Sequence, residues 1–170
     1  MLEAFADVIA PGGAGIVISS MAGYMQPQLD PAQEHSLGHT PADELLGLSF
    51  LSEEAISNSG AAYAMSKRAN HLRVQAAAVP WGKCGARINS ISPGIILTPL
   101  AQDELSSEGA PIYAQMIEKS AAGRVGTTDE IASAAAYLLG PDASFITGSD
   151  LLIDGGVIAA IRAGLVQLGG

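Results

Sequence analysis

Cysteine is almost absent from this sequence, in which Cys84 is the only one among 170 residues. A single thiol excludes an internal disulfide framework and suits a chain that folds in a reducing compartment. We therefore expect a cytoplasmic protein whose fold is held by its core rather than by cross-links. Cys84 itself is expected to be a small, partly buried apolar side chain.

Basic residues are also scarce, with 8 Lys and Arg against 17 Asp and Glu. The formal net charge of −9 makes a nucleic acid or an anionic membrane an unsuitable partner. No apolar run approaches the roughly 18 residues that cross a bilayer, and residues 1–3 lack the basic start of a signal peptide. The acidic residues gather at 30–54 and 103–108, where we expect a solvated surface.

Residues that bind metals are few. His35 and His39 lie four positions apart, a spacing that zinc ligands use on helices. Gly38 weakens a helix there and the sequence places no third ligand beside the pair, so a solvated pair is the commoner case and we expect no metal. His71, in another segment, is expected to be a packing or surface residue.

What the sequence does contain is an alternation of strands and helices. Short apolar runs rich in β-branched residues predict buried parallel strands at 15–20, 85–92 and 151–154. Helical spacing and capping signals predict helices at residues 2–9, 61–79, 100–105, 110–119, 128–139 and 157–168. The helix 61–79 is expected to stop before Pro80. This alternation indicates right-handed crossovers and an α/β fold with a parallel sheet.

Two segments interrupt the alternation. Residues 24–59 are rich in proline and acids and are expected to be a helical insertion or lid, with helix starts at Thr40-Pro41 and at Ser52. Residues 95–123 are expected to be a substrate loop or lid. Its apolar residues either line a pocket or pack the lid, and they include Ile112, Tyr113 and Met116.

Tyr63 and Lys67 lie four residues apart in the predicted helix 61–79, so they share one helix face. A cation held beside a phenol favours the phenolate. A tyrosine in that setting exchanges protons near neutral pH. Because this spacing also arises by chance, the pair alone is a weak signal, and its meaning depends on the surrounding motifs.

Five motifs in chain order resemble those of the short-chain dehydrogenase/reductase family. They are residues 18–23 (Ile-Ser-Ser-Met-Ala-Gly), residues 63–67 (Tyr-Ala-Met-Ser-Lys), residues 87–94 (Arg-Ile-Asn-Ser-Ile-Ser-Pro-Gly) with Thr98-Pro99, residues 123–124 (Gly-Arg), and residues 146–156, which end in Ile-Asp-Gly-Gly. Five ordered matches over nearly the whole chain are far more specific than any one of them.

The resemblance implies a fold, an activity and a cofactor. The fold would be α/β, the C-terminal portion of a doubly wound, Rossmann-type parallel sheet, forming a single partial domain over 1–170 with three strands and the inserted helical segment. The activity would be the interconversion of a secondary alcohol and a ketone or aldehyde, with NAD or NADP as cofactor.

The resemblance also implies site residues. Tyr63 would be the acid/base for the substrate oxygen, Lys67 would favour the phenolate and bond the nicotinamide ribose, and Ser20 would hold the substrate carbonyl or hydroxyl. The implied cofactor-binding residues are Tyr63, Lys67, Pro93, Gly94, Ile96 and Thr98. For Ser19 and Thr98 the alternative is capping or strand-end hydrogen bonding. At the end of the predicted third strand, Asp154 is expected to make a turn hydrogen bond.

Ser20 and Tyr63 lie much further apart than in most family members, which makes residues 24–59 an insertion. That feature resembles the bacterial 3α-hydroxysteroid dehydrogenase/carbonyl reductase branch and implies a hydroxysteroid or a xenobiotic carbonyl compound as substrate. In the family, oligomer contacts come from the long helix and from the last helix with its strand. The insertion would obstruct the first surface, so we expect a homo-oligomer, a dimer or tetramer, formed through 128–139 and 148–168.

The family's glycine-rich phosphate loop and the Asn of its proton relay have no match in these 170 residues. We therefore expect the last three strands of the family's sheet, with the strand at 15–20 left unpaired on one edge. We also expect this chain alone to bind a dinucleotide weakly. A second hypothesis is a truncated, non-catalytic remnant that acts only as an oligomerisation or interaction module.

Overall fold

The computed structural model describes residues 1–56, 58–106 and 109–167. Within them, three strands form one parallel sheet in the order β1-β2-β3. The strands are β1 (Ala14–Ile18), β2 (Arg87–Pro93) and β3 (Asp150–Ile153). Each strand lies close to its predicted position, so the expected α/β fold with a three-stranded parallel sheet is confirmed. Among the described strands, β1 pairs with β2 alone.

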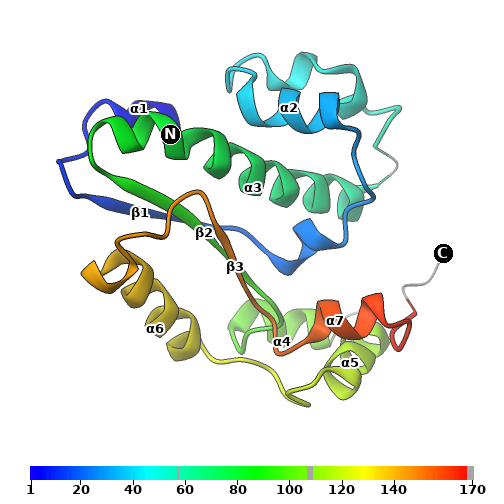
Figure 1. The fold of residues 1–170 in the computed structure, drawn as a ribbon. Coiled ribbons are helices and arrows are strands. Elements are labelled where there is room, and N and C mark those ends of the chain that lie inside the picture. Colours follow the sequence, from blue (N-terminus) through cyan, green and yellow to red (C-terminus); the bar gives the residue numbers. More distant parts are fainter. Residues whose placement is uncertain (57, 107–108, 168–170) are drawn as a thin grey trace.

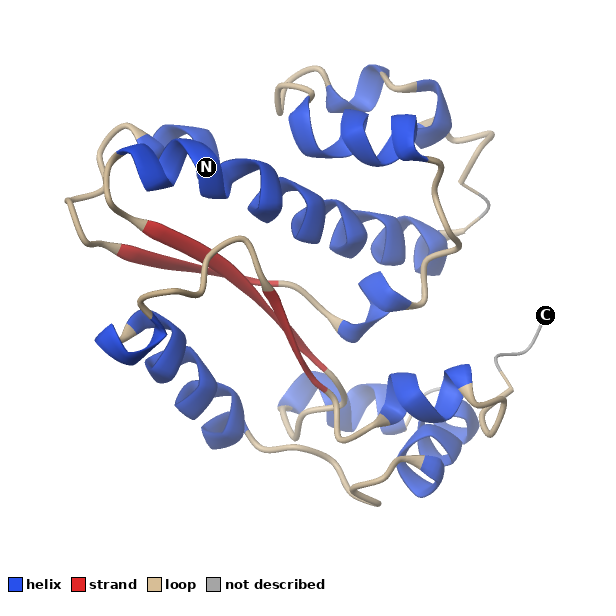
Figure 2. Ribbon diagram, in the orientation of Figure 1, coloured by secondary structure: helices blue, strands red, loops and turns tan. Residues whose placement is uncertain are grey.

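Helices cover both faces of the sheet. They are α1 (Leu2–Ala6), α2 (Pro31–His39), α3 (Ser59–Lys83), α4 (Pro99–Leu105), α5 (Ala110–Lys119), α6 (Thr128–Leu139) and α7 (Val157–Arg162), with 3₁₀ turns η1 (Met21–Tyr24), η2 (Leu45–Gly47), η3 (Ser49–Leu51) and η4 (Pro141–Ala143). Figures 1 and 2 show α1 and α3 on one side of the sheet and α6 on the other, while α4, α5 and α7 gather near the carboxyl ends of β2 and β3.

The central strand β2 is buried from both sides. Ile88 packs with Val74 and Trp81 of α3, whereas Ile91 packs with Leu138 of α6. Because side chains alternate along a strand, the even-numbered residues of β2 face α3. That face is apolar at Ile88 and becomes polar toward the carboxyl end of the strand, where the next two positions are serines.

Helix α3 does not stop before Pro80, and this prediction is wrong. The helix continues through Pro80 to Lys83, although proline cannot donate a backbone hydrogen bond there. Tertiary contacts outweigh that loss, because Trp81 is 3% exposed and its Nε1 donates to the backbone oxygen of Leu2 at 3.1 Å. Cys84, which follows the helix, is exposed rather than partly buried.

The segment 24–59 is helical, but its helix starts differ from those predicted. Thr40 ends α2 instead of starting a helix, and Ser52 begins only a single turn. The actual start is Asp30, whose side chain accepts from the backbone N–H of Gln33 at 2.8 Å in a capping box. Helix α2 then packs on the outer face of α3 through Leu37, which is buried beside Met65 and Leu72.

The first and last helices are shorter than predicted. Helix α1 ends at Ala6 instead of residue 9, and α7 ends at Arg162, so the predicted tail to residue 168 is wrong over 163–167, while residue 168 lies outside the described residues. The two short helices α4 and α5 and the capped helix α6 confirm the prediction. None of the described helices combines the length and apolar composition that crossing a bilayer requires.

Candidate active site

An open cavity of about 850 Å³ lies beyond the carboxyl ends of β1 and β2. In open α/β sheets, ligands bind in the crevice at this end of the strands. Of the residues predicted for the site, the lining includes Ser20, Tyr63, Pro93, Gly94, Ile96 and Thr98. The structure therefore brings together six of the seven predicted site residues around one space.

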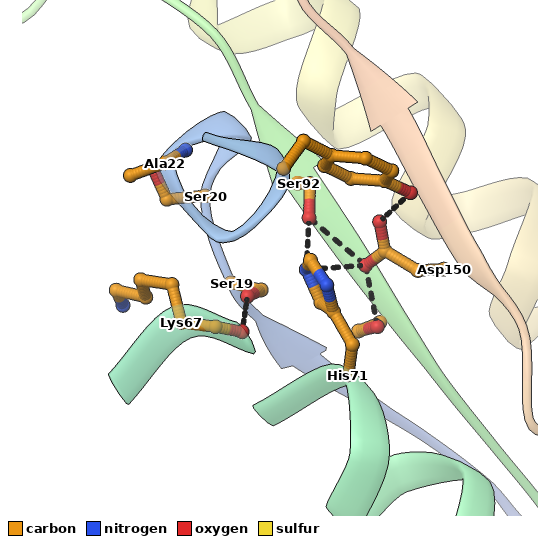
Figure 3. Close-up of polar contacts among 9 residues, drawn as sticks. Ser19, Ser20, Ala22, Lys67, His71, Ser92 and Asp150 are labelled. Carbon is orange, nitrogen blue, oxygen red and sulfur yellow. Dashed lines mark hydrogen bonds and ion pairs between the residues drawn. The ribbon is translucent and has the colours of Figure 1, made fainter. Parts of the chain in front are cut away.

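Two serines connect the end of β1 to its surroundings (Figure 3). The hydroxyl of Ser19 donates to the backbone oxygen of Lys67 at 3.0 Å, which joins the strand end to α3. Ser20 caps η1, because its Oγ accepts from the backbone N–H of Ala22 at 3.1 Å. Ser19 thus makes the strand-end bond that was the alternative to a direct role, and Ser20 stands at the cavity wall.

Tyr63 and Lys67 occupy the same face of α3, as their spacing predicts. The ammonium Nζ of Lys67 lies 5.3 Å from the centroid of the Tyr63 ring, within the range of a cation–π contact. The Tyr63 side chain is 51% exposed and lines the cavity. Lys67 is the one predicted site residue that does not line it.

The turn after β2 is fixed by close backbone packing. The N–H of Gly94 donates to the oxygen of Ile153 at 2.8 Å, and a Cβ at position 94 would lie 2.6 Å from the Cα of Asp154. Only glycine fits this approach. Thr98 caps α4, because its Oγ1 accepts from the N–H of Ala101 at 3.2 Å, so its capping role is present as well.

Asp154 serves the turn after β3, as predicted. Its carboxylate oxygens accept from the backbone N–H groups of Gly156 at 2.8 Å and Ile158 at 2.7 Å. The carboxylate therefore fixes the start of α7 and is occupied by structural bonds.

The far wall of the cavity is apolar. It includes Ile112, Tyr113 and Met116 of α5. For these three residues the sequence allowed either a role in lining a pocket or a role in packing the lid. The sequence did not predict that Met25, which follows η1, and Thr128 and Ile131 of α6 line the cavity, because nothing local marks them as neighbours of the site. None of the described lining residues carries a formal charge.

Behind the cavity, a buried polar network joins four elements (Figure 3). Asp150 of β3 accepts from Ser90 at 2.5 Å and Ser92 at 2.9 Å on one oxygen, and from the Tyr24 hydroxyl at 2.7 Å on the other. The Nε2 of His71 lies 2.8 Å from the Ser92 hydroxyl. His71 is therefore a packing residue with a defined polar partner, and no sequence pattern indicated the network.

The electrostatics of the network follow from its burial. Burial, followed by the hydrogen bond and the charge of Asp150, raises the pKa of Tyr24 well above its ordinary value, so its hydroxyl remains a donor. Burial lowers the pKa of His71, an effect that Asp150 opposes and Arg68 reinforces. Because Ser92 donates to Asp150, the Nε2 of a neutral His71 carries the hydrogen and donates to Ser92.

The histidines of α2 stack without forming a recognisable metal centre. The rings of His35 and His39 lie 4.2 Å apart between centroids, and the Nδ1 of His39 lies 2.9 Å from the backbone oxygen of His35. Across the described ranges, no three His, Cys, Asp or Glu side chains gather as metal ligands would.

The fold and this site define part of a Rossmann-type α/β protein whose ligand cavity contains a Ser, a Tyr and a glycine-containing turn. Residues 32–158 match the protein family described as Enoyl-(Acyl carrier protein) reductase. The chain is 41% identical over 157 residues to the short-chain dehydrogenase/reductase bsc3 of Alternaria brassicicola, a match that covers 91% of this chain and 57% of that protein.

Two further proteins resemble almost the whole chain. One is the 3-alpha-hydroxysteroid dehydrogenase/carbonyl reductase of Comamonas testosteroni, 32% identical over 167 residues, which cover 95% of this chain and 63% of that protein. The other is the crystal structure of the 3-alpha-hydroxysteroid dehydrogenase from Pseudomonas sp. B-0831 complexed with NADH. It matches with a TM-score of 0.73 and 30% sequence identity, and the match covers 95% of this chain and 63% of that chain. The chain belongs to the short-chain dehydrogenase/reductase family, as the motifs predicted. It spans 57% and 63% of the two curated relatives.

Proposed function

We propose that this protein is an NAD- or NADP-dependent oxidoreductase that interconverts a secondary alcohol and a ketone or aldehyde. One observation carries the proposal: Ser20, Tyr63 and the turn 93–98 meet around a single cavity at the carboxyl ends of β1 and β2. Lys67 stands against the tyrosine ring from the same helix face. The family membership of the chain and the NADH bound by its structural neighbour from Pseudomonas support this assignment.

The residues present fit the nicotinamide end of such a cofactor. Pro93, Gly94, Ile96 and Thr98 line the cavity, so this turn could offer polar groups to the amide of the cofactor while the cavity offers open volume to its ring. When bound, the reduced cofactor supplies a hydride to the carbonyl carbon, and the oxidised form accepts one from the alcohol.

The chain's own residues bind the substrate oxygen and transfer its proton. As the carbonyl is reduced, its oxygen gains negative charge and takes the proton from the Tyr63 hydroxyl, while the cation of Lys67 stabilises the phenolate that remains. Ser20 accepts from Ala22 through its oxygen, so its hydroxyl hydrogen is the part that donates to the substrate oxygen. In the oxidation direction the phenolate takes the proton back.

The cavity favours an apolar, uncharged substrate. Its far wall is formed by methionine, isoleucine and tyrosine side chains, and no described lining residue is charged. A carboxylate or phosphate placed there would lose its hydration without finding an opposite charge. The volume of about 850 Å³ would be shared between the nicotinamide of the cofactor and the substrate. We therefore propose a hydroxysteroid or a comparable xenobiotic carbonyl compound, which accords with the name of the Comamonas relative.

The proposal is tested by following the oxidation of NADH and NADPH by the 170-residue chain with steroid ketones, and with sugars and oxo acids for comparison. We expect turnover with the steroid ketones and a cofactor KM at or above about 1 mM, the upper end of the usual range. Tyr63→Phe removes only the hydroxyl and is expected to lower kcat by about 1,000-fold.

Tyr137→Phe is the matched control, because Tyr137 lies on α6, is 48% exposed and does not line the cavity. Its kcat should equal that of the wild type. Equal rates for wild type and Tyr63→Phe, or no turnover at saturating cofactor, would refute the proposed function. Faster turnover of oxo acids than of steroid ketones would refute the substrate class alone.

A further inference from the structure

The turn η1 determines where the cavity wall and Ser20 stand. It begins at Ser20, its N-cap, and carries Met21 and Ala22 of the cavity lining, with Met25 next along the chain. The turn lies directly against α3, because a Cβ added at Gly23 would come within 2.6 Å of Cε1 of His71. A shift of η1 would therefore move Ser20 and the wall together.

Tyr24, the last residue of η1, is the side chain that fixes the turn from the other side. Its hydroxyl donates to Oδ2 of Asp150 at 2.7 Å. Its ring lies 5.1 Å from the His71 ring, and the guanidinium carbon of Arg162 lies 5.7 Å from its centroid. One side chain of η1 thus contacts α3, β3 and α7.

Asp150 is a rigid acceptor for this hydroxyl. Its other oxygen is held by Ser90 at 2.5 Å and Ser92 at 2.9 Å, and Ser92 is in turn held by His71 at 2.8 Å. The carboxylate is 9% exposed, so these donors replace the water that it loses on burial. The acceptor position is consequently set by β2, β3 and α3 together.

The location of the network indicates a role beyond packing. Along the α3-facing side of β2, Ile88 packs in an apolar cluster, and polar side chains occur only at Ser90 and Ser92, nearest the cavity. Replacing buried ionic groups by apolar side chains of the same shape is often neutral for stability, and in some proteins such groups serve structural specificity instead. The polar residues are thus placed where the position of the cavity wall matters.

We propose that Tyr24 is a positioning residue, which through its hydrogen bond to Asp150 holds η1, and with it the Ser20 hydroxyl, in place relative to Tyr63. The inference rests on the proposed function, because it assigns Tyr24 an effect on turnover through Ser20. Tyr24 is not among the residues that line the cavity, so its effect would be indirect.

The test uses the 170-residue chain with Tyr24→Phe, which removes the hydroxyl and keeps the ring between His71 and Arg162. Hydrogen exchange is measured on peptides that cover 20–25, where the N–H groups of Ala22, Gly23 and Met25 bond within the turn. We expect exchange there to accelerate about tenfold, the effect of losing a hydrogen bond to a charged group. Tyr137→Phe is the control and should leave it unchanged.

Kinetics then separate positioning from a purely structural role. We expect Tyr24→Phe to lower kcat between about 10- and 100-fold with little change in substrate KM. In the Ser20→Ala background it should have no further effect, because the group that it positions is gone. Multiplying effects in the double variant, an unchanged kcat despite faster exchange, or unchanged exchange in 20–25 would each overturn the inference.

A wild-type chain without turnover would refute the proposed function separately. The exchange comparison would then decide the inference alone. Faster exchange confined to 20–25 in Tyr24→Phe would support it, and exchange equal to that of the wild type would overturn it.

Discussion

Replacing Gly23 with alanine tests how closely η1 is seated on α3. The new Cβ would lie 2.6 Å from Cε1 of His71 and 3.0 Å from the backbone atoms N of Arg68 and C of Lys67. Carbon atoms normally approach to about 3.5–4.0 Å, so something must move by about 1 Å. Two of the three obstructing atoms belong to a helix backbone, and the third belongs to a ring bonded to Ser92 at 2.8 Å. None of these three atoms can move away from the new Cβ without disturbing the helix backbone or the hydrogen bond of His71.

We expect Gly23→Ala to lower the free energy of unfolding by about 2 kcal/mol, the middle of the range for overpacked sites. For a chain of this size the midpoint of thermal unfolding should fall by about 4–8 °C. Gly82→Ala is the matched control, since a Cβ there meets nothing within 4 Å and the residue lies inside α3. It should stabilise the chain by about 0.5–1 kcal/mol through helix propensity.

Urea unfolding of both variants measures the difference, provided that the slope against denaturant stays constant. If the free energy of unfolding of Gly23→Ala lay within about 0.5 kcal/mol of the wild-type value, the usual range for surface substitutions, the close packing of η1 on α3 would be refuted.

Three further predictions concern pH, a helix cap and association. Because burial lowers the pKa of His71 from its ordinary value of 6.5, its contribution to stability is complete above pH 6.5 and is lost as pH falls through the lower folded-state pKa. Urea titrations between pH 7.5 and 5 should show this loss, and the stability of His71→Gln should depend less on pH. A wild-type stability that rises as the pH falls from 7.5 to 5 would contradict the assignment. Thr127→Ala removes the capping box of α6 and should cost about 1 kcal/mol in the same assay, whereas no change would show that the cap is not formed. If the chain associates through α6 and β3, light scattering should report smaller particles after Tyr137→Glu with Leu151→Glu, two residues 48% and 39% exposed, and an unchanged mass would reject that surface.

Features with a short-range cause could be predicted from the sequence. The capping box of α6 and the turn bonds of Asp154 involve residues that are two to four positions apart. The strands followed from continuous apolar runs. The start of α2 was also readable, because Asp30, Pro31 and Gln33 form a capping signal, yet the Thr40-Pro41 pair suggested a later start.

Features with a long-range cause could not be predicted. The helix α3 continues through Pro80 because Trp81 is held by its hydrogen bond to the backbone oxygen of Leu2, 79 positions away in the chain. The bond of Tyr24 to Asp150 spans 126 positions, and an isolated Asp in a sequence is normally predicted to lie on the surface. Motif resemblance predicted Ser20, Tyr63 and the turn 93–98 as site residues, but it did not predict the network around Asp150.

The transfer of hydride from cofactor to substrate is the most direct test of the proposed function. The wild-type chain is incubated with a steroid ketone and with NADH or NADPH that carries deuterium at the transferable position of the nicotinamide, and the product is analysed by mass spectrometry. We expect an alcohol that carries the deuterium on the former carbonyl carbon, formed by the wild type and at a rate about 1,000-fold lower by Tyr63→Phe. An alcohol without deuterium, or the same labelled product formed as fast by Tyr63→Phe, would contradict the proposed function.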